Sequence, residues 1–129
     1  MSQDELKFIK EDIVLASALR TATATSDDQN NDGYRGVILI LNMSAEDGAI
    51  TLTPKVQVKD PVSGNYVDLA GAAFAAQTAT GTKMLTIYPG LAETANVSVS
   101  DVLPKTWRIV STMSGSTSMT YSIAAILIP

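Results

Sequence analysis

A polar segment near the N-terminus carries the residue types that bind a hard cation. Asp28, Asn30, Asp32 and Gly33 follow the D-x-N-x-D-G spacing that opens an EF-hand loop, in which oxygen ligands surround Ca²⁺. The twelfth position of such a loop is a bidentate glutamate, but here it is Leu39, within a run of strand-forming residues. The sequence therefore favours a solvated turn, and we expect neither a metal nor a cofactor.

Few other residues offer catalytic chemistry. The chain has no histidine and no cysteine, which removes the usual general base, the usual soft metal ligands and thiolate chemistry. No serine has a Ser-x-x-Lys partner, and no glycine-rich loop follows a strand and opens a helix. No spacing pairs the carboxylates near predicted turns as a glycosidase requires. These carboxylates are Asp60, Asp68, Glu93 and Asp101. We expect a protein that is not an enzyme.

The composition also limits the classes of partner that the protein can bind. Thirteen acidic and nine basic side chains give a formal net charge of −4, which argues against binding nucleic acid through its phosphates. Aromatic residues make up only 5% of the chain, too few for a convincing platform that stacks bases or sugars. No run approaches the roughly 20 apolar residues of a membrane helix. We therefore expect neither nucleic acid nor a membrane as a partner.

Hydrophobic alternation predicts strands. Residues 34–44 are the strongest candidate, since apolar side chains occupy both faces and indicate a central or covered strand. Their first face carries Val37, Leu39, Leu41 and Met43, and their second carries Ile38 and Ile40. Residues 50–59 alternate cleanly, as a half-exposed antiparallel strand does, and Pro54 indicates an edge or a bulge. Further strands are expected at 13–22, 66–70, 83–88, 105–113 and 117–129, the last two paired with each other.

These elements predict an all-β fold of about seven or eight strands, arranged as a two-layer antiparallel β-sandwich of jelly-roll or immunoglobulin-like kind. We expect one domain over residues 13–129, preceded by an N-terminal arm over residues 1–12. The arm suits one or two helical turns as well as an extended conformation, and the sequence leaves both open.

The stretch KDPVSGNYVDLAGAAFAA joins a specified turn to a run of alanines. Asp60, Pro61 and Gly64 supply the residues of a tight reversal, after which Val67 and Leu69 are expected to point inward. The alanine run that follows is too short for a stable helix. It is either an ordinary loop packed on its own sandwich or a thin contact strip between subunits.

Two further features bear on contacts. Trp107 and Arg108 point to opposite faces of a strand, so Trp107 is expected in the core beside Ile109, leaving Arg108 outside for a salt bridge across an interface. The closing residues Ile126, Leu127 and Ile128 are apolar on both faces, which requires cover from the fold or from a neighbour.

The stretch from Gly36 to Pro129 resembles small structural proteins of tailed bacteriophages. The likeness lies in a strand followed by KDPVSGNYVDL, an Ala/Thr-rich segment with LTIYPGL, then LPKTWRIV and a closing TYSIAAILI. Such proteins are virion components, most similar to head decoration or cement proteins with a jelly-roll-like sandwich. A tail or fibre component and a carbohydrate-binding host-attachment module remain alternatives.

The resemblance implies a protein made in the bacterial host's cytoplasm that sits on the outer capsid surface, with the major capsid protein as partner. It also implies a homo-oligomer, with a trimer favoured by the three-fold positions of a capsid lattice. The candidate contact residues with the capsid or between subunits are Ala72, Ala73, Phe74, Arg108, Ile126, Leu127 and Ile128.

Overall fold

The structure is a computed structural model that describes residues 8–48, 50–115 and 118–129. All regular elements among these residues are strands, which confirms the all-β prediction. Three of the strands have only two residues each, which accounts for the excess over the expected seven or eight. The described strands are β1 (Lys10–Arg20), β2 (Ala24–Thr25), β3 (Gln29–Asn30), β4 (Gly36–Asp47), β5 (Thr51–Lys59), β6 (Tyr66–Ala73), β7 (Gly81–Ile87), β8 (Ser98–Val99), β9 (Thr106–Ser114) and β10 (Ser118–Ile128).

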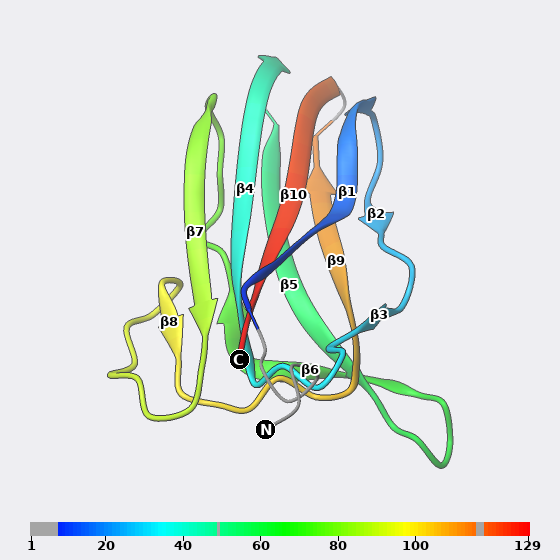
Figure 1. The fold of residues 1–129 in the computed structure, drawn as a ribbon. Helices are drawn as coiled ribbons and strands as arrows, with labels where there is room; N and C mark the ends of the chain where they lie inside the picture. The colour runs from blue at the N-terminus through cyan, green and yellow to red at the C-terminus, as the bar shows by residue number, and fades with distance from the viewer. Residues whose placement is uncertain (1–7, 49, 116–117) are drawn as a thin grey trace.

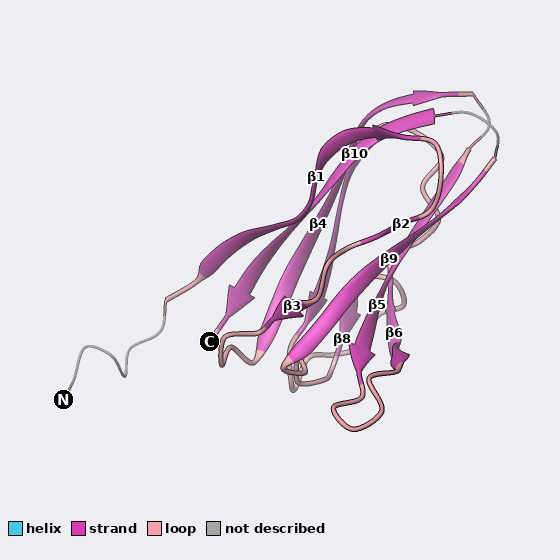
Figure 2. Ribbon diagram, turned by 90° about the vertical axis from the view of Figure 1, so that its right-hand side faces the viewer, coloured by secondary structure: helices cyan, strands magenta, loops and turns pink. Residues whose placement is uncertain are grey.

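The strands form two sheets that pack face to face, as the predicted sandwich requires (Figures 1 and 2). Sheet A has the order β1-β10-β4-β7-β8, and sheet B has the order β2-β9-β5-β6, with β3 also paired to β9. The pairs are antiparallel except for the short parallel pair of β7 and β8. When β2 and β3 are taken as one interrupted strand, the chain crosses between the sheets in the order of a jelly roll.

The central position predicted for residues 34–44 is confirmed. β4 lies between β10 and β7, and its inner face buries Val37, Leu39 and Leu41 completely. Trp107 and Ile109 of β9 reach the same core from sheet B and are also buried, as expected. The alternation along β4 and β9 therefore supplies one side of the core from each sheet.

The expected pairing of the last two strands is wrong. β9 lies in sheet B beside β5, whereas β10 lies in sheet A between β1 and β4 (Figure 1). Apolar and polar side chains alternate along both strands. This pattern is compatible with a hairpin in one sheet and equally with two strands that lie in different sheets. The crossing is preferred here because it places the apolar inner face of each strand against the opposite sheet.

Pro54 does not mark a sheet edge, because β5 lies between β9 and β6. The irregularity that a strand proline indicates lies one residue further on. Between Lys55 and Gln57 the β6 ladder shifts, residues 69–72 form a bulge in β6, and Gly71 adopts a φ of +77°. The bulge therefore lies in the partner strand β6, whereas β5 pairs with β9 without a shift through Pro54.

The β5–β6 hairpin turns where KDPVSGN predicts it. Asp60 accepts hydrogen bonds from the Val62 N–H at 3.0 Å and from the Ser63 hydroxyl at 2.6 Å, which closes the turn. The expected inward position of Val67 is wrong, because the hairpin extends past the end of the sandwich (Figure 1) and leaves Val67 58% exposed. Leu69, nearer the body, packs against the core as expected.

β1 begins at Lys10, inside the predicted arm, and ends at Arg20. It pairs with β10 through two irregular steps, between Ile13 and Leu15 and between Leu15 and Ala18. The described part of the arm is therefore not helical, and residues 1–7 lie outside the described residues.

Arg20 spans the irregular part of this ladder, a role that its sequence context did not predict. Its guanidinium donates to the carbonyl of Ala16 at 2.6 Å and to the carbonyl of Tyr121 at 2.7 Å. It also lies 4.4 Å from the centroid of the Tyr121 ring. One planar cation thus ties together two strands where their ladder is broken.

Candidate functional site

The outer face of sheet A presents apolar side chains in rows across four strands. Strand register aligns Ile13, Ala124, Ile40 and Met84 in one row, from β1 through β10 and β4 to β7. The next row aligns Glu11, Ile126, Ile38 and Thr86, and Ile128 lies beyond it at the end of β10. We call the apolar members of this face the apolar strip: Ile13, Ile38, Ile40, Met84, Ala124, Ile126 and Ile128.

The apolar strip is open to solvent at both ends and partly covered in the middle. Ile13 is 73% exposed and Met84 is 53% exposed, whereas Ile40 and Ile126 are half-buried by their neighbours on the sheet. The row beyond Ile40 is polar, since Thr82 donates to Asn42 at 2.9 Å. A contiguous apolar area bordered by polar side chains is typical of a surface that contacts another macromolecule.

A notch interrupts the strip next to β1. Ala124 has a much smaller side chain than Ile13 and Ile40, its neighbours in the row. A hollow of about 500 Å³, wide open to solvent, lies there and is lined by Glu11, Asp12, Ile13 and Ala124. Ile13 and Ala124 make part of the notch apolar, and Glu11 adds an acidic side chain on the same face of β1. The Asp12 carboxylate instead pairs with Lys10 at 3.7 Å.

The outer face of sheet B differs, because its polar side chains satisfy one another. Arg108 donates through Nε to Gln57 at 2.9 Å, and Gln57 donates to Asp68 at 3.0 Å. The Arg108 guanidinium also lies 3.4 Å from the centroid of the Tyr66 ring, whose hydroxyl donates to Asp28 at 2.5 Å. Arg108 thus faces outward, but these contacts within its own chain already engage it.

This network shifts the titration of its carboxylates. The hydrogen bond from Tyr66, together with that from Lys59, lowers the pKa of Asp28 below its ordinary value. The hydrogen bond from Gln57 is the main cause of the lowered pKa of Asp68. Both carboxylates are thus held ionised by structural partners, as in a network that braces the base of the β5–β6 hairpin.

The residues of the EF-hand-like spacing do not converge. Asp28 bonds to Tyr66, whereas Asp32 forms an ion pair with Lys10 of β1 at 2.5 Å. The Asn31 carbonyl accepts the Tyr34 N–H at 2.8 Å, and Asp32 and Gly33 inside this turn both have positive φ. Within the described residues, no three His, Cys, Asp or Glu side chains gather as a metal site would need.

The other carboxylates weighed for chemistry make local structural bonds. Asp60 closes its own hairpin, and Asp68 bonds across the outer face of sheet B. Glu93 accepts the Ser100 N–H at 3.2 Å, and Asp101 accepts the Val102 N–H at 2.8 Å. These carboxylates thus stabilise turns or, for Asp68, the pairing of β6 with β5.

Three of the seven candidate contact residues lie in the core, which corrects their assignment. Ala72, Phe74 and Leu127 are almost fully buried, so a partner cannot reach them unless the sandwich opens. The alanine run packs on its own protein there because the bulge at Gly71 turns Ala72 and Phe74 inward. The remaining candidates are half-buried at the surface: Ala73, Arg108, Ile126 and Ile128.

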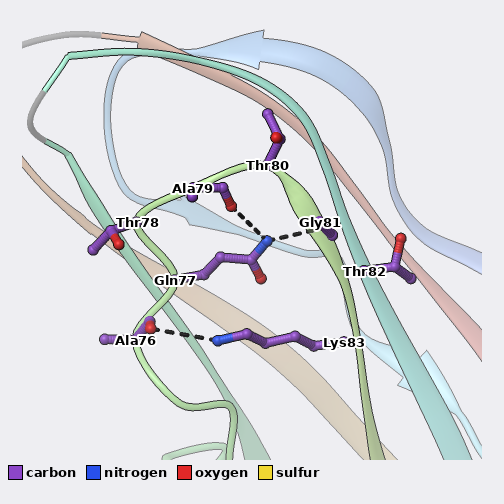
Figure 3. Close-up of a pocket in the computed structure, with 8 residues that line it drawn as sticks. All are labelled: Ala76, Gln77, Thr78, Ala79, Thr80, Gly81, Thr82 and Lys83. Carbon is purple, nitrogen blue, oxygen red and sulfur yellow. Dashed lines mark hydrogen bonds between the residues drawn. The ribbon is translucent and has the colours of Figure 1, made fainter.

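A second hollow, of about 230 Å³, lies within the loop that leads into β7 (Figure 3). Gln77 is buried there and donates through Nε2 to the Ala79 carbonyl at 3.0 Å and to the Gly81 carbonyl at 3.1 Å. Its amide lies inside the loop, and Lys83 donates to the Ala76 carbonyl at 3.4 Å. These bonds give Gln77 a structural role, since they hold the loop closed over the end of the sandwich.

Sequence reasoning found part of the apolar strip and missed the rest. The second apolar face of residues 34–44 and the two-sided closing strand predicted that Ile38, Ile40, Ile126 and Ile128 need cover. Ile13 and Met84 were missed, since the alternation along their own strands does not show which residues of other strands lie beside them. They join the strip only through the β1–β10 and β4–β7 registers.

The chain matches no family model, no curated protein and no solved structure in the three comparisons made. Within the described residues, no helix is long and apolar enough to cross a membrane.

Proposed function

We propose that this protein is a non-enzymatic structural protein of a tailed phage, seated as a homo-oligomer on the outer surface of the capsid. The apolar strip is the observation that carries the proposal. An isolated copy leaves Ile13 and Met84 in water at the two ends of a four-strand row, and contact with another protein removes that area from solvent.

The polar chemistry of the molecule supports a binding role. The carboxylates near turns and the side chains on sheet B are engaged in bonds that stiffen the fold, such as those of Asp60 and Arg108. A decoration protein needs a rigid body with an adhesive face and no reactive group. The jelly roll is also found in viral capsid and lectin domains, a likeness of fold that adds only by analogy.

The aromatic side chains favour a structural protein over a sugar-binding module. Trp107 and Tyr121 are buried, and the rings of Tyr66 and Tyr88 lie beside arginine side chains, with Arg35 5.3 Å from the Tyr88 centroid. Among the described aromatic residues only Phe8 is largely exposed. Sugar binding ordinarily uses exposed aromatic faces, which these contacts occupy.

The first test of the proposal is to determine where in the virion the protein is found. Heads and tails of the virion are separated, and the protein is sought in each fraction by mass spectrometry. We expect it in the head fraction. Recovery with tails alone would contradict the capsid assignment and support a tail or fibre protein.

Binding to heads that lack the protein tests the surface. Purified protein should pellet with such heads, and Met84→Lys should weaken that binding by placing an ammonium group in the apolar strip. Val62→Lys is the matched control, because Val62 is 94% exposed at the tip of the hairpin, away from the strip. Equal binding by both variants would exclude the strip from the capsid contact.

A further inference from the structure

We infer that β1 (Lys10–Arg20) is a strap that opens from the edge of sheet A as a unit while the rest of the sandwich stays folded, and that Arg20 is the latch that holds it closed (Figure 1). This inference goes beyond the proposed function and does not depend on it. Opening takes Ile13 out of the apolar strip and uncovers the β10 edge from Met119 to Leu127. The position of the strap therefore determines whether the apolar strip is complete.

Little apolar surface holds the strap to the sandwich. Of its eleven residues only Val14 is buried, and Leu15 packs partly against the core. Ile13 is 73% exposed and Leu19 is 66% exposed, whereas β10 buries every second residue along its length. Because burial of apolar area is the main force that keeps an element in place, β1 is the long strand of sheet A that can leave it at the lowest cost.

The backbone ladder of the strap is also weak. From Ile13 to Leu15, and again from Leu15 to Ala18, β1 advances one residue more than β10 does. Each extra residue disrupts the hydrogen bonding of the ladder locally. On its other side β10 pairs with β4 from Ser118 to Ile128 with a single shift. β10 therefore stays in sheet A when β1 leaves it.

The chain is held differently at the two ends of the strap. At the start, Lys10 pairs with Asp32, but the two side chains are 44% and 41% exposed, so this ion pair contributes little. Beyond the end, the Thr23 hydroxyl accepts the Met113 N–H at 3.0 Å and β2 pairs with β9, which fixes the chain to sheet B. Opening is therefore hinged at residues 21–22.

Arg20 ties the strap to a residue that cannot move with it. Its guanidinium donates to the Tyr121 carbonyl at 2.7 Å and lies 4.4 Å from the centroid of the Tyr121 ring. Tyr121 is fully buried in the core and belongs to β10. The same guanidinium donates to the Ala16 carbonyl at 2.6 Å, a bond within β1 that moves with the strap. Opening therefore breaks the two Tyr121 contacts together.

Hydrogen exchange of the isolated full chain, followed by mass spectrometry of peptide fragments, tests whether β1 opens alone. We expect the hydrogen-bonded amides of β1 to exchange at least about a hundredfold faster than those of β4. Urea should barely change the β1 rate, because local opening exposes little surface, but it should steeply increase the β4 rate, which reports global unfolding. Equal rates with equal urea dependence in the two strands would overturn the inference.

A disulfide that clamps the strap provides the matched control. The chain has no cysteine, and Leu19 is paired with Thr120 in the β1–β10 ladder, so Leu19→Cys combined with Thr120→Cys offers one cross-strand bridge. The oxidised protein should exchange its β1 amides about as slowly as its β4 amides, and the same protein with reductant should behave as the wild type does. Fast β1 exchange in the oxidised protein would contradict opening at this ladder.

Two substitutions separate the latch from the general stability of the fold. Arg20→Met removes the Tyr121 contacts, so β1 exchange should rise by about tenfold or more. Ile87→Val weakens the core in β7, with two strands between it and β1, in packing that the open state retains. It should therefore speed β4 exchange and leave β1 exchange unchanged.

Each substitution has an outcome that would refute its part of the inference. Unchanged β1 exchange in Arg20→Met would show that Arg20 is not the latch. An increase of β1 exchange in Ile87→Val equal to that of β4 would show that β1 opens only when the whole sandwich unfolds. Neither measurement uses phage heads, so failure of the strap and failure of the capsid proposal are distinguishable.

Discussion

At the scale of single residues, Trp107 and Arg20 show two ways of holding a sandwich together. Trp107 lies 1% exposed in the core, opposite Arg108 on the same strand, where its apolar bulk joins the two sheets. Arg20 instead uses polar contacts, to carbonyl groups at the broken part of the β1–β10 ladder. Trp107 therefore stabilises the sandwich by filling the core, and Arg20 stabilises it by hydrogen bonds to the backbone.

Trp107→Ala should lower the free energy of unfolding by about 3–5 kcal/mol, because it removes a large buried ring and leaves a cavity. Urea denaturation at neutral pH measures the change. Val62→Ala is the control and should stay within about 0.5 kcal/mol of the wild type. A loss below about 1 kcal/mol for Trp107→Ala would show that the ring is not in the core.

Arg20→Met should lower the free energy of unfolding by about 1–3 kcal/mol, since it keeps the apolar stem and removes the donors to Ala16 and Tyr121. Arg20→Lys should restore only part of this loss, because an ammonium group lacks the planar fork that reaches several carbonyls. The same denaturation assay applies, with Lys105→Met as the exposed control. Full rescue by lysine would indicate that charge alone matters.

At the scale of elements, the β5–β6 hairpin depends on ionised carboxylates. The Ser63 hydroxyl and then the Val62 N–H lower the pKa of Asp60 in its turn. The pKa values of Asp28 and Asp68 at the hairpin base are lowered as well. The hairpin extends beyond the sandwich, so these bonds replace the support that a second sheet provides elsewhere.

Acid should therefore destabilise the protein. A carboxyl group with a lowered folded pKa contributes stability that is present above its unfolded pKa of about 3.9 and is lost as the pH falls through the folded pKa. We expect a flat urea midpoint from pH 7 to about 5 and a decline below about 4. Asp28→Asn should make the decline shallower, and a midpoint that rises on acidification would contradict this account.

At the scale of the whole molecule, the topology joins distant parts of the chain. Lys10 of β1 pairs with Leu127 of β10, so sheet A closes only when the two ends of the described chain meet. β9 and β10 add a crossing between sheets that no local hairpin guides.

Folding should therefore be slow for a domain of this size, on the order of milliseconds to seconds, because long loops must close before their contacts stabilise them. Trp107 is the only tryptophan, so its fluorescence after stopped-flow dilution from urea reports burial of the core. Refolding within microseconds would show that the distant pairings form no part of the rate-limiting step.

The sequence by itself determined the class of fold and several local features. Alternation along residues 105–113 placed Trp107 in the core beside Ile109, because side chains of a strand point to opposite faces with a period of two. The Asp60 turn was likewise predictable, since its bonds link residues within a few positions of each other. The face on which a side chain lies and the bonds within a tight turn both depend on residues close together in the sequence, so they could be predicted without the tertiary structure.

Only the tertiary structure decided which strands are neighbours, and with them the candidate site. The apolar strip depends on registers between β1, β10, β4 and β7. The notch is lined by Ile13 and Ala124, which are more than a hundred positions apart in the chain and are paired in the sheet. The burial of Ala72 and Phe74 likewise follows from a bulge in β6. The alternation along a strand specifies which side chains share a face, but it does not specify which strands lie beside that strand. The free energy of strand pairing depends on how all the strands pack together.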